Sequence, residues 1–128
     1  MTGAPSLSVI HELYSALIAR DINAAYSTLA RAETHHTDMM LLAQLLLDTM
    51  RLSLMYRYSP SMREEIEADH SEHYTDIIKR GAVESTEAIS SRGIVALITA
   101  IERIAYASIP TLPLELAFIE MTGIEAAL

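Results

Sequence analysis

The chain has 128 residues, of which 51% are hydrophobic, with only 4 glycines, 4 prolines and no cysteine. This length and composition exclude a disordered chain and are typical of one domain with a substantial core. The net charge of −8 argues against direct binding of nucleic acid, because phosphate contacts require clustered Lys and Arg.

The absence of cysteine excludes disulfides, thiol catalysis and thiolate metal sites, and it fits a cytoplasmic protein. Residues 1–7 are predicted to be a loose leader, and residues 8–128 to form a helical domain. No Lys or Arg precedes an apolar run near the N-terminus, so no signal peptide is expected. The longest apolar stretches are far shorter than the ~20 residues of a membrane span, so we expect no membrane association.

Two short helices are predicted at the start of the domain. The first runs from about Ser8 to Ile18, and Asp21 is placed to cap the second. The inward positions of both helices recur at helical spacing and are Ile10, Leu13, Tyr14, Leu17, Ile22, Ala25, Tyr26 and Leu29. Only residues 19–21 connect the helices, which predicts an antiparallel hairpin. The next break contains His35 and His36, which are expected to be exposed.

The third helix, predicted from about Asp38 to Tyr58, is the most apolar segment of the chain. Its polar residues form two narrow stripes on nearly opposite sides: Gln44, Asp48 and Arg51 on one, and Thr49, Ser53 and Arg57 on the other. A helix that is apolar almost all round lies either at the centre of a bundle or against a second protein.

A fourth helical segment follows the stop at Pro60. Residues 61–64 have the pattern of a capping box, in which the side chains of Ser61 and Glu64 satisfy free backbone N–H groups. The segment is predicted to continue to Arg80, either unbroken or with a break near Asp69. Gly81 is predicted to end it.

The fifth helix is predicted to begin at Ser85 or Thr86. Its core stripe consists of apolar residues at helical spacing: Ile94, Leu97, Ile98, Ile101, Ile104 and Ala105. A second side carries small residues that allow a neighbouring helix to come close: Ala96, Ala100 and Ala107.

A two-proline elbow separates the fifth helix from the last one. Pro110 ends the fifth helix, Thr111 is placed to cap the next, and Pro113 falls in a first turn where a missing N–H costs little. The last helix is predicted over residues 112–122, with Gly123 as its end. No segment alternates with period two for long enough to form a strand. The predicted fold class is therefore all-α, a single-domain helical bundle of five to six helices.

Histidine is the only residue type that suggests a site. Glu67 and His70 have the Glu-x-x-His spacing of carboxylate-bridged di-iron bundles, but that site requires two such motifs and two further glutamates. On a continuous helix His73 shares the face of His70, so a metal-binding bundle that uses these three residues stays a minor alternative. The chain has neither a Gly-x-Ser-x-Gly elbow nor a glycine-rich phosphate loop. We therefore assign no catalytic, cofactor-binding or metal-binding residue.

Four segments carry a resemblance to a known family. The strongest is Pro-Thr-Leu-Pro-Leu-Glu-Leu-Ala-Phe-Ile at residues 110–119. The others are residues 17–25, residues 52–60 together with the acidic stretch around residues 63–65 that follows them, and residues 85–89. In order and spacing these segments resemble domain III, the collar domain, of the gamma/tau subunit of the bacterial DNA polymerase III clamp loader. The family usually has a basic segment before the last helix, whereas residues 106–109 here carry no charge.

The resemblance implies an oligomerisation module in DNA replication. In the family this domain joins subunits into a ring-shaped collar and holds ATPase modules that lie outside this sequence. The chain itself is then expected to be non-catalytic, to need no cofactor, and to bind other copies of itself and the delta and delta-prime subunits. Contact with nucleic acid or membrane is not expected. The family position gives four interface candidates: Leu112, Leu114, Glu115 and Phe118. The residues alone leave open an unrelated helical adaptor that binds other proteins.

Overall fold

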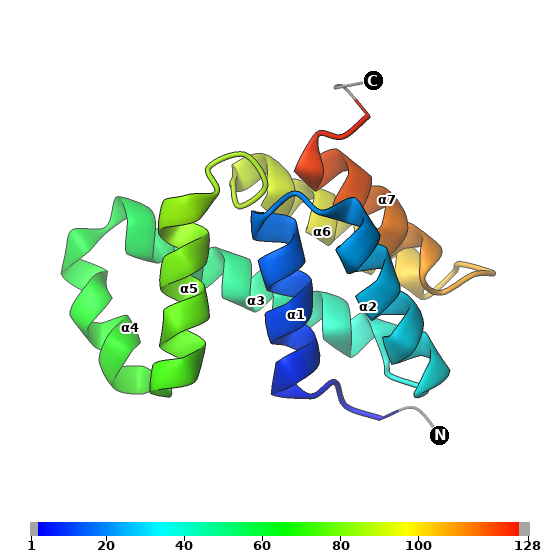
Figure 1. The fold of residues 1–128 in the computed structure, drawn as a ribbon, viewed down its shortest axis with the longest axis horizontal. Helices are drawn as coiled ribbons and strands as arrows, with labels where there is room; N and C mark the ends of the chain where they lie inside the picture. The colour runs from blue at the N-terminus through cyan, green and yellow to red at the C-terminus, as the bar shows by residue number, and fades with distance from the viewer. Residues whose placement is uncertain (1–2, 126–128) are drawn as a thin grey trace.

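Seven α-helices and no strand make up the part of the chain that the computed structural model describes, residues 3–125 (Figure 1). In chain order they are α1 (Leu7–Ile18), α2 (Ile22–Thr34), α3 (Met39–Tyr58), α4 (Arg63–Asp69), α5 (Glu72–Glu84), α6 (Ser91–Ile104) and α7 (Leu112–Thr122). A 3₁₀ turn, η1 (Pro60–Met62), leads from α3 into α4. The predicted all-α single domain is confirmed, but the helix count is seven rather than five to six.

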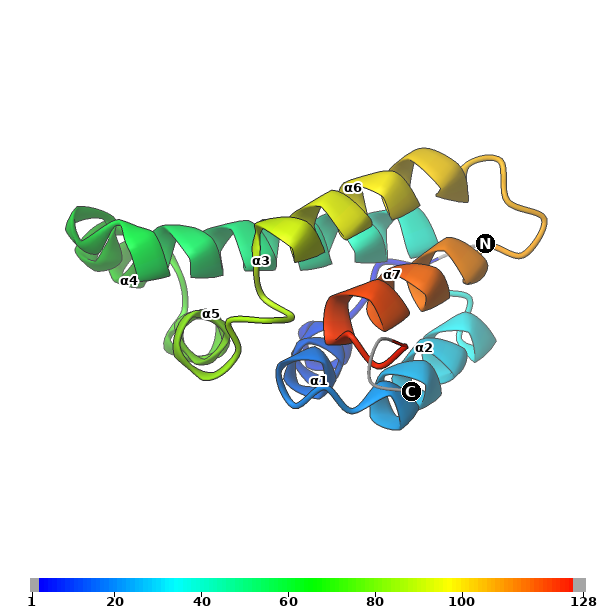
Figure 2. The same cartoon turned by 90° about the horizontal axis from the view of Figure 1, so that it is seen from above.

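The bundle is organised around α3. This helix packs against α5 on one side and α6 on another, and α7 lies beside α6 (Figure 2). The hairpin of α1 and α2 is confirmed, with α1 against α5 and α2 against α7. Of the two positions that its apolar surface allowed, α3 therefore takes the central one. By length and composition alone α3 also meets the criteria for a membrane-spanning helix, as the central helix of a bundle often does.

One polar stripe of α3 holds α1 and α5 in place through buried hydroxyl groups. Thr49 bonds the hydroxyl of Tyr74 on α5 at 2.8 Å. One turn further along, Ser53 donates to the carbonyl of Ile78 at 2.9 Å. Because Ser53 has only one hydroxyl proton, the Tyr14 hydroxyl must donate the 2.5 Å bond that joins it to the Ser53 oxygen. The stripe that stood out in the sequence is therefore an internal contact.

The third member of this stripe, Arg57, binds the backbone carbonyls at the C-terminal end of α5. Its guanidinium donates to the carbonyls of Gly81 at 3.0 Å, Ala82 at 2.8 Å and Ser85 at 2.9 Å. The last carbonyls of a helix have no partner within the helix, so a cation placed there satisfies both their hydrogen bonding and the helix dipole.

The prediction that Gly81 ends a helix is wrong, because α5 continues through it to Glu84. A Cβ at this position would lie 2.5 Å from the Tyr14 hydroxyl oxygen and 2.6 Å from Ser53 Oγ. The glycine is needed for the close packing of three helices and has no role as a terminator.

The fourth predicted segment is two helices, which accounts for the extra helix. His70 is extended (φ −129°, ψ 159°), and Ser71 starts α5 by accepting from the N–H of Tyr74 at 3.2 Å. The alternative of a break near Asp69 is thus confirmed. The predicted capping box is wrong: Ser61 lies within η1, and α4 has no side-chain cap.

The fifth predicted helix begins later than expected, at Ser91 with Ser90 as its cap. Residues 85–90 instead form a turn in which Ser85 Oγ accepts from the N–H of Ala88 at 3.3 Å. Ala88 and Ile89 are fully buried. The serine that was expected to cap a helix therefore closes a local turn, an alternative that short hydroxyl side chains offer the backbone.

Helix α7 begins at Leu112 and follows Thr111, which occupies the N-cap position. Pro113 lies in its first turn, as predicted. Thr111 has helical backbone angles and makes no side-chain capping bond, so the predicted hydroxyl cap is wrong. Gly123 ends the helix with φ 66°, as predicted, in the left-handed conformation that favours glycine.

The α1–α2 hairpin ties down both ends of α7. Arg20 Nε donates to the carbonyl of Thr122 at 2.7 Å, and the Tyr26 hydroxyl donates to the carbonyl of Glu115 at 3.0 Å. Asp21 caps α2 as predicted by accepting from the N–H of Ala24 at 3.0 Å. The position of α7 is therefore fixed from its backbone as well as from its buried side chains.

Two backbone hydrogen bonds at Gly3 and the N-cap of α1 at Ser6 join the predicted leader to the fold. Gly3 donates to the carbonyl of His36 at 2.8 Å and accepts from the N–H of Asp38 at 2.9 Å. Helix α1 begins at Leu7, one residue before the predicted start. Residues 1–2 of the leader and 126–128 of the domain lie outside the described residues. His35 and His36 are exposed, as predicted.

Candidate protein-binding surface

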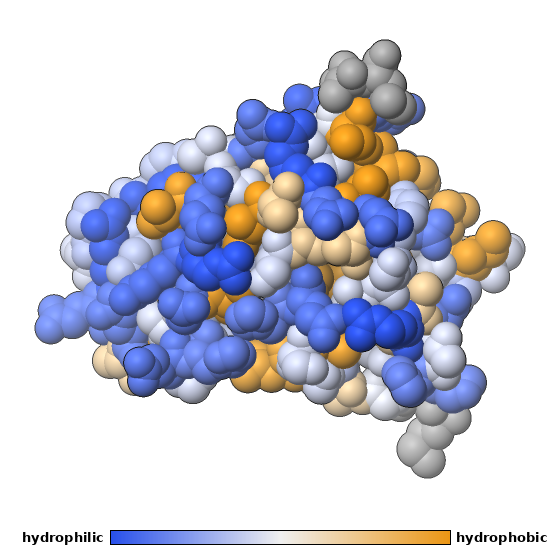
Figure 3. Space-filling model, in the orientation of Figure 1, coloured by the Kyte–Doolittle hydropathy of each residue, from blue (hydrophilic) through white to orange (hydrophobic). Residues whose placement is uncertain are grey.

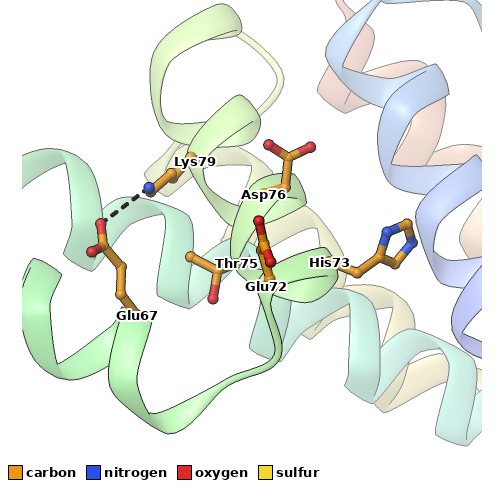
Figure 4. Close-up of a pocket in the computed structure, with 6 residues that line it drawn as sticks. All are labelled: Glu67, Glu72, His73, Thr75, Asp76 and Lys79. Atoms are coloured by element: carbon orange, nitrogen blue, oxygen red, sulfur yellow. Dashed lines mark ion pairs between the residues drawn. The ribbon is translucent and has the colours of Figure 1, made fainter.

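The hollow between α4 and α5 contains two of the three residues considered for a metal site (Figure 4). It has a volume of about 700 Å³ and is lined by Glu67, Glu72, His73, Thr75, Asp76 and Lys79. Figure 4 shows Glu67 turned toward Lys79, while His73 turns away toward α1. The hollow is acidic and open to solvent.

Glu67 is held by two partners from neighbouring helices. Its carboxylate accepts from the Tyr56 hydroxyl at 2.8 Å and pairs with Lys79 Nζ at 3.1 Å. Both hydrogen bonds lower the pKa of Glu67 below its ordinary value, and the bond from the Tyr56 hydroxyl has the larger effect. This carboxylate ties α4 to α3 and α5.

The histidines are also separated. His70 Nδ1 lies 2.9 Å from the carbonyl of Ile66, to which it must donate because a carbonyl only accepts. His73 stacks on His11 of α1, with ring centroids 4.8 Å apart. Among residues 3–125 no three His, Asp or Glu side chains are grouped closely enough to hold a metal ion. The break before α5 is the reason, since it removes the continuous face that the metal hypothesis required.

A different surface, formed by α6, the elbow and α7, exposes apolar side chains. Six large ones are at least two-fifths exposed and are Val95, Ile98, Tyr106, Ile109, Leu112 and Leu116. We call these residues the α6–α7 surface. In Figure 3 apolar residues follow α7 to the tip of the elbow, whereas the side of α4 and α5 is largely hydrophilic. The elbow extends beyond the helices at this end of the molecule (Figure 2).

A groove runs between the two helices of this surface. It has a volume of about 440 Å³, and its lining includes the small residues Ala96, Ala100 and Ala117. Ala96 and Ala100, from the alanine side predicted in the sequence, thus lie next to α7, as expected for helices in close approach. The third predicted alanine, Ala107, lies beyond the end of α6 at Ile104 and outside the groove. Val95 and Leu116 form apolar walls, and they are 61% and 51% exposed.

Charged residues mark both ends of the groove. At one end Arg92 pairs with Glu120 at 2.9 Å, which links α6 to α7. At the other end lies Arg103, also in the lining, which makes no ion pair within the described part of the chain. The groove therefore has an apolar centre and a cationic end.

The four predicted interface residues divide between core and surface. Leu114 and Phe118 are fully buried, so in this structure they offer no surface to a partner. Leu112 is 40% exposed and Glu115 is partly exposed. Whether Leu112 and Glu115 contact another subunit stays a prediction.

Sequence reasoning missed part of the exposed set. Ile98 and Ala105 were assigned to the core stripe of α6, but both are exposed. Leu116 was not singled out, because α7 is apolar on every side and its pattern does not separate inside from outside. The signal that existed was the surplus of apolar faces on this last helix.

Comparisons of the chain with protein-family models, with curated proteins and with solved structures gave no match.

Proposed function

We propose that this chain is a non-catalytic assembly module that binds other protein subunits through the α6–α7 surface. In its specific form, the proposal is the collar domain of a DNA polymerase III clamp loader, of the gamma/tau type. The partners are then copies of the same domain and the delta and delta-prime subunits.

One observation carries the proposal. Of the nine large apolar side chains that are exposed in residues 3–125, six belong to the α6–α7 surface. Scattered exposed apolar residues are normal, but their concentration on two neighbouring helices and the segment between them favours a protein interaction site. Burying each half-exposed side chain contributes roughly 1 kcal/mol. Six of them give a useful fraction of the 4–15 kcal/mol that association costs, so polar contacts at the rim must complete the interface.

The resemblance supports the same surface. Residues 110–119, which match the collar family best, form the end of the elbow and most of α7. This segment supplies Leu112 and Leu116 to the surface. The backbone anchors from Arg20 and Tyr26 keep α7 in place, so a partner meets a preformed surface.

The test is assembly with clamp-loader subunits. The delta and delta-prime subunits from the same genome are mixed with the chain at micromolar concentration and followed by sedimentation velocity. We expect the chain to move into a faster-sedimenting species that contains all three proteins. A chain that sediments alone, under conditions where an intact gamma/tau subunit assembles, contradicts the collar assignment.

An unrelated helical adaptor is the second candidate, and the α6–α7 groove is the observation that favours it. Grooves between two helices accept a third helix from many kinds of protein. The two candidates share a binding surface and differ in the identity of the partner.

A further inference from the structure

We infer that the α6–α7 groove binds an amphipathic helix from a partner protein, and that carboxylates border the apolar stripe of this helix. The inference rests on the proposed function only in that the α6–α7 surface contacts protein. It applies equally to a clamp-loader partner and to an unrelated one.

The dimensions of the groove select a short helix. Along α6 its lining runs from Arg92 to Arg103, eleven residues apart, which corresponds to roughly 16 Å or three helical turns. The alanines of the lining let a partner backbone come close. The exposed walls, Val95 and Leu116, offer apolar contacts on both sides. An occupant of three turns presents apolar residues at i, i+4 and i+7 to such a groove.

Charge decides which amphipathic helix fits. The charged residues of the groove are Arg92, Arg103 and Glu120, on a chain whose net charge is −8. Arg92 and Glu120 neutralise each other, which leaves Arg103 as the charge available at the rim. The α4–α5 hollow, by contrast, has three carboxylates in its lining and one lysine. The net charge of −8 opposes the approach of an acidic helix to the chain as a whole, and the local charges favour the α6–α7 groove over the α4–α5 hollow as the place where it binds.

Two designed peptides test the inference. Both are sixteen-residue, N-capped, fluorescein-labelled helices with leucines at i, i+4 and i+7 and alanine elsewhere on that face. One carries glutamate at every flanking position and the other carries lysine. Binding to the full chain is measured by fluorescence anisotropy at about 0.15 M salt. We expect the glutamate peptide to bind about three- to fivefold more tightly than the lysine peptide, because among residues 3–125 Arg103 is the one unpaired charge in the lining of the groove.

Matched variants locate the binding site. Leu116→Asp places a charge on the groove wall and is expected to weaken the glutamate peptide at least about tenfold. Val83→Asp, on the exposed face of α5, introduces the same charge away from the groove and should leave affinity unchanged. Arg103→Glu should weaken the glutamate peptide about three- to fivefold, whereas Arg51→Glu on α3 has a much smaller effect. All four positions are exposed, and circular dichroism confirms that each variant folds.

Three results overturn the inference: no binding of the glutamate peptide to the wild-type chain, equal or tighter binding of the lysine peptide, or binding that Leu116→Asp leaves unchanged. Each is distinguishable from failure of the collar assignment. A chain that binds the glutamate peptide but ignores delta and delta-prime keeps the groove and loses the collar. A chain that assembles with delta and delta-prime but does not bind the glutamate peptide keeps the collar and loses the groove.

Discussion

Replacement of Gly81 by alanine is expected to destabilise the protein, although the same change usually stabilises a helix. Gly81 lies in the interior of α5, where helix propensity favours alanine by about 1 kcal/mol. The added Cβ would lie 2.5 Å from the Tyr14 hydroxyl oxygen and 2.6 Å from Ser53 Oγ. Both atoms belong to fully buried side chains that are bonded to each other, so neither can move away without breaking that bond.

The magnitude follows from three opposing contributions. Overpacking costs typically 1–3 kcal/mol. Breaking the Tyr14–Ser53 bond leaves a buried hydroxyl unsatisfied and adds about 1 kcal/mol or more. After the helix-propensity gain, the free energy of unfolding should fall by about 2 kcal/mol. For a domain of this size the melting temperature should then drop by roughly 6–10 °C.

Urea unfolding followed by circular dichroism measures this change. Gly3→Ala is the matched control, because a Cβ at Gly3 meets nothing within 4 Å, and its effect should stay within about 0.5 kcal/mol. Tyr14→Phe removes the atom nearest to the new methyl group, so the double variant should lose less than the sum of the single losses. A Gly81→Ala protein as stable as the wild type, or more stable, refutes the packing of α1, α3 and α5 described above.

Other parts of the structure give further expectations. Burial raises the pKa of Tyr14 far above its ordinary value near 10, so above about pH 10 the unfolded chain loses this proton while the folded chain keeps it. This group should therefore leave the free energy of unfolding unaffected below about pH 10 and lower it as the pH rises further. In urea titrations at increasing pH, the free energy of unfolding of Tyr14→Phe should fall less steeply than that of the wild type. An equally steep fall in both proteins would speak against burial of the phenol. Arg57→Met removes three hydrogen bonds to the end of α5 and should cost about 2–3 kcal/mol in urea unfolding, whereas Arg51→Met, at an exposed position of the same helix, should cost less than about 0.5 kcal/mol. Dialysis against EDTA should leave the thermal midpoint unchanged in the wild type and in a His70→Ala/His73→Ala variant, because His70 donates a hydrogen bond to a backbone carbonyl and His73 stacks on His11. A midpoint that EDTA lowers in the wild type alone would revive the metal hypothesis.

Local signals in the sequence predicted some helix ends correctly, whereas the caps expected at Ser61, Ser85 and Thr111 were wrong. Asp21 caps α2, Pro113 lies in the first turn of α7 and Gly123 ends that helix, because each of these effects depends on the backbone of the residue itself and its immediate neighbours. Gly81 was misinterpreted because its role depends on Tyr14 and Ser53, which are distant in the chain. Without the fold, a glycine at the end of an apolar pattern looks like a terminator.

The binding surface was predicted by region and only partly by residue. A surplus of apolar faces pointed to α7, and Leu112 is exposed there, but Leu114 and Phe118 lie in the core. A helix that is apolar all round carries no periodic signal for its outward side. Exposed Ile98 follows from a different cause, because α6 has neighbours on only some of its sides and its helical periodicity could not show which sides are covered.

The most direct test of the assembly surface is hydrogen–deuterium exchange of the chain alone and in complex with its clamp-loader partners. The account predicts slower exchange in the complex over residues 92–120, in α6, the elbow and the first turns of α7, with α4 and α5 unchanged. Slower exchange confined to α4 and α5, with residues 92–120 unaffected, would contradict it.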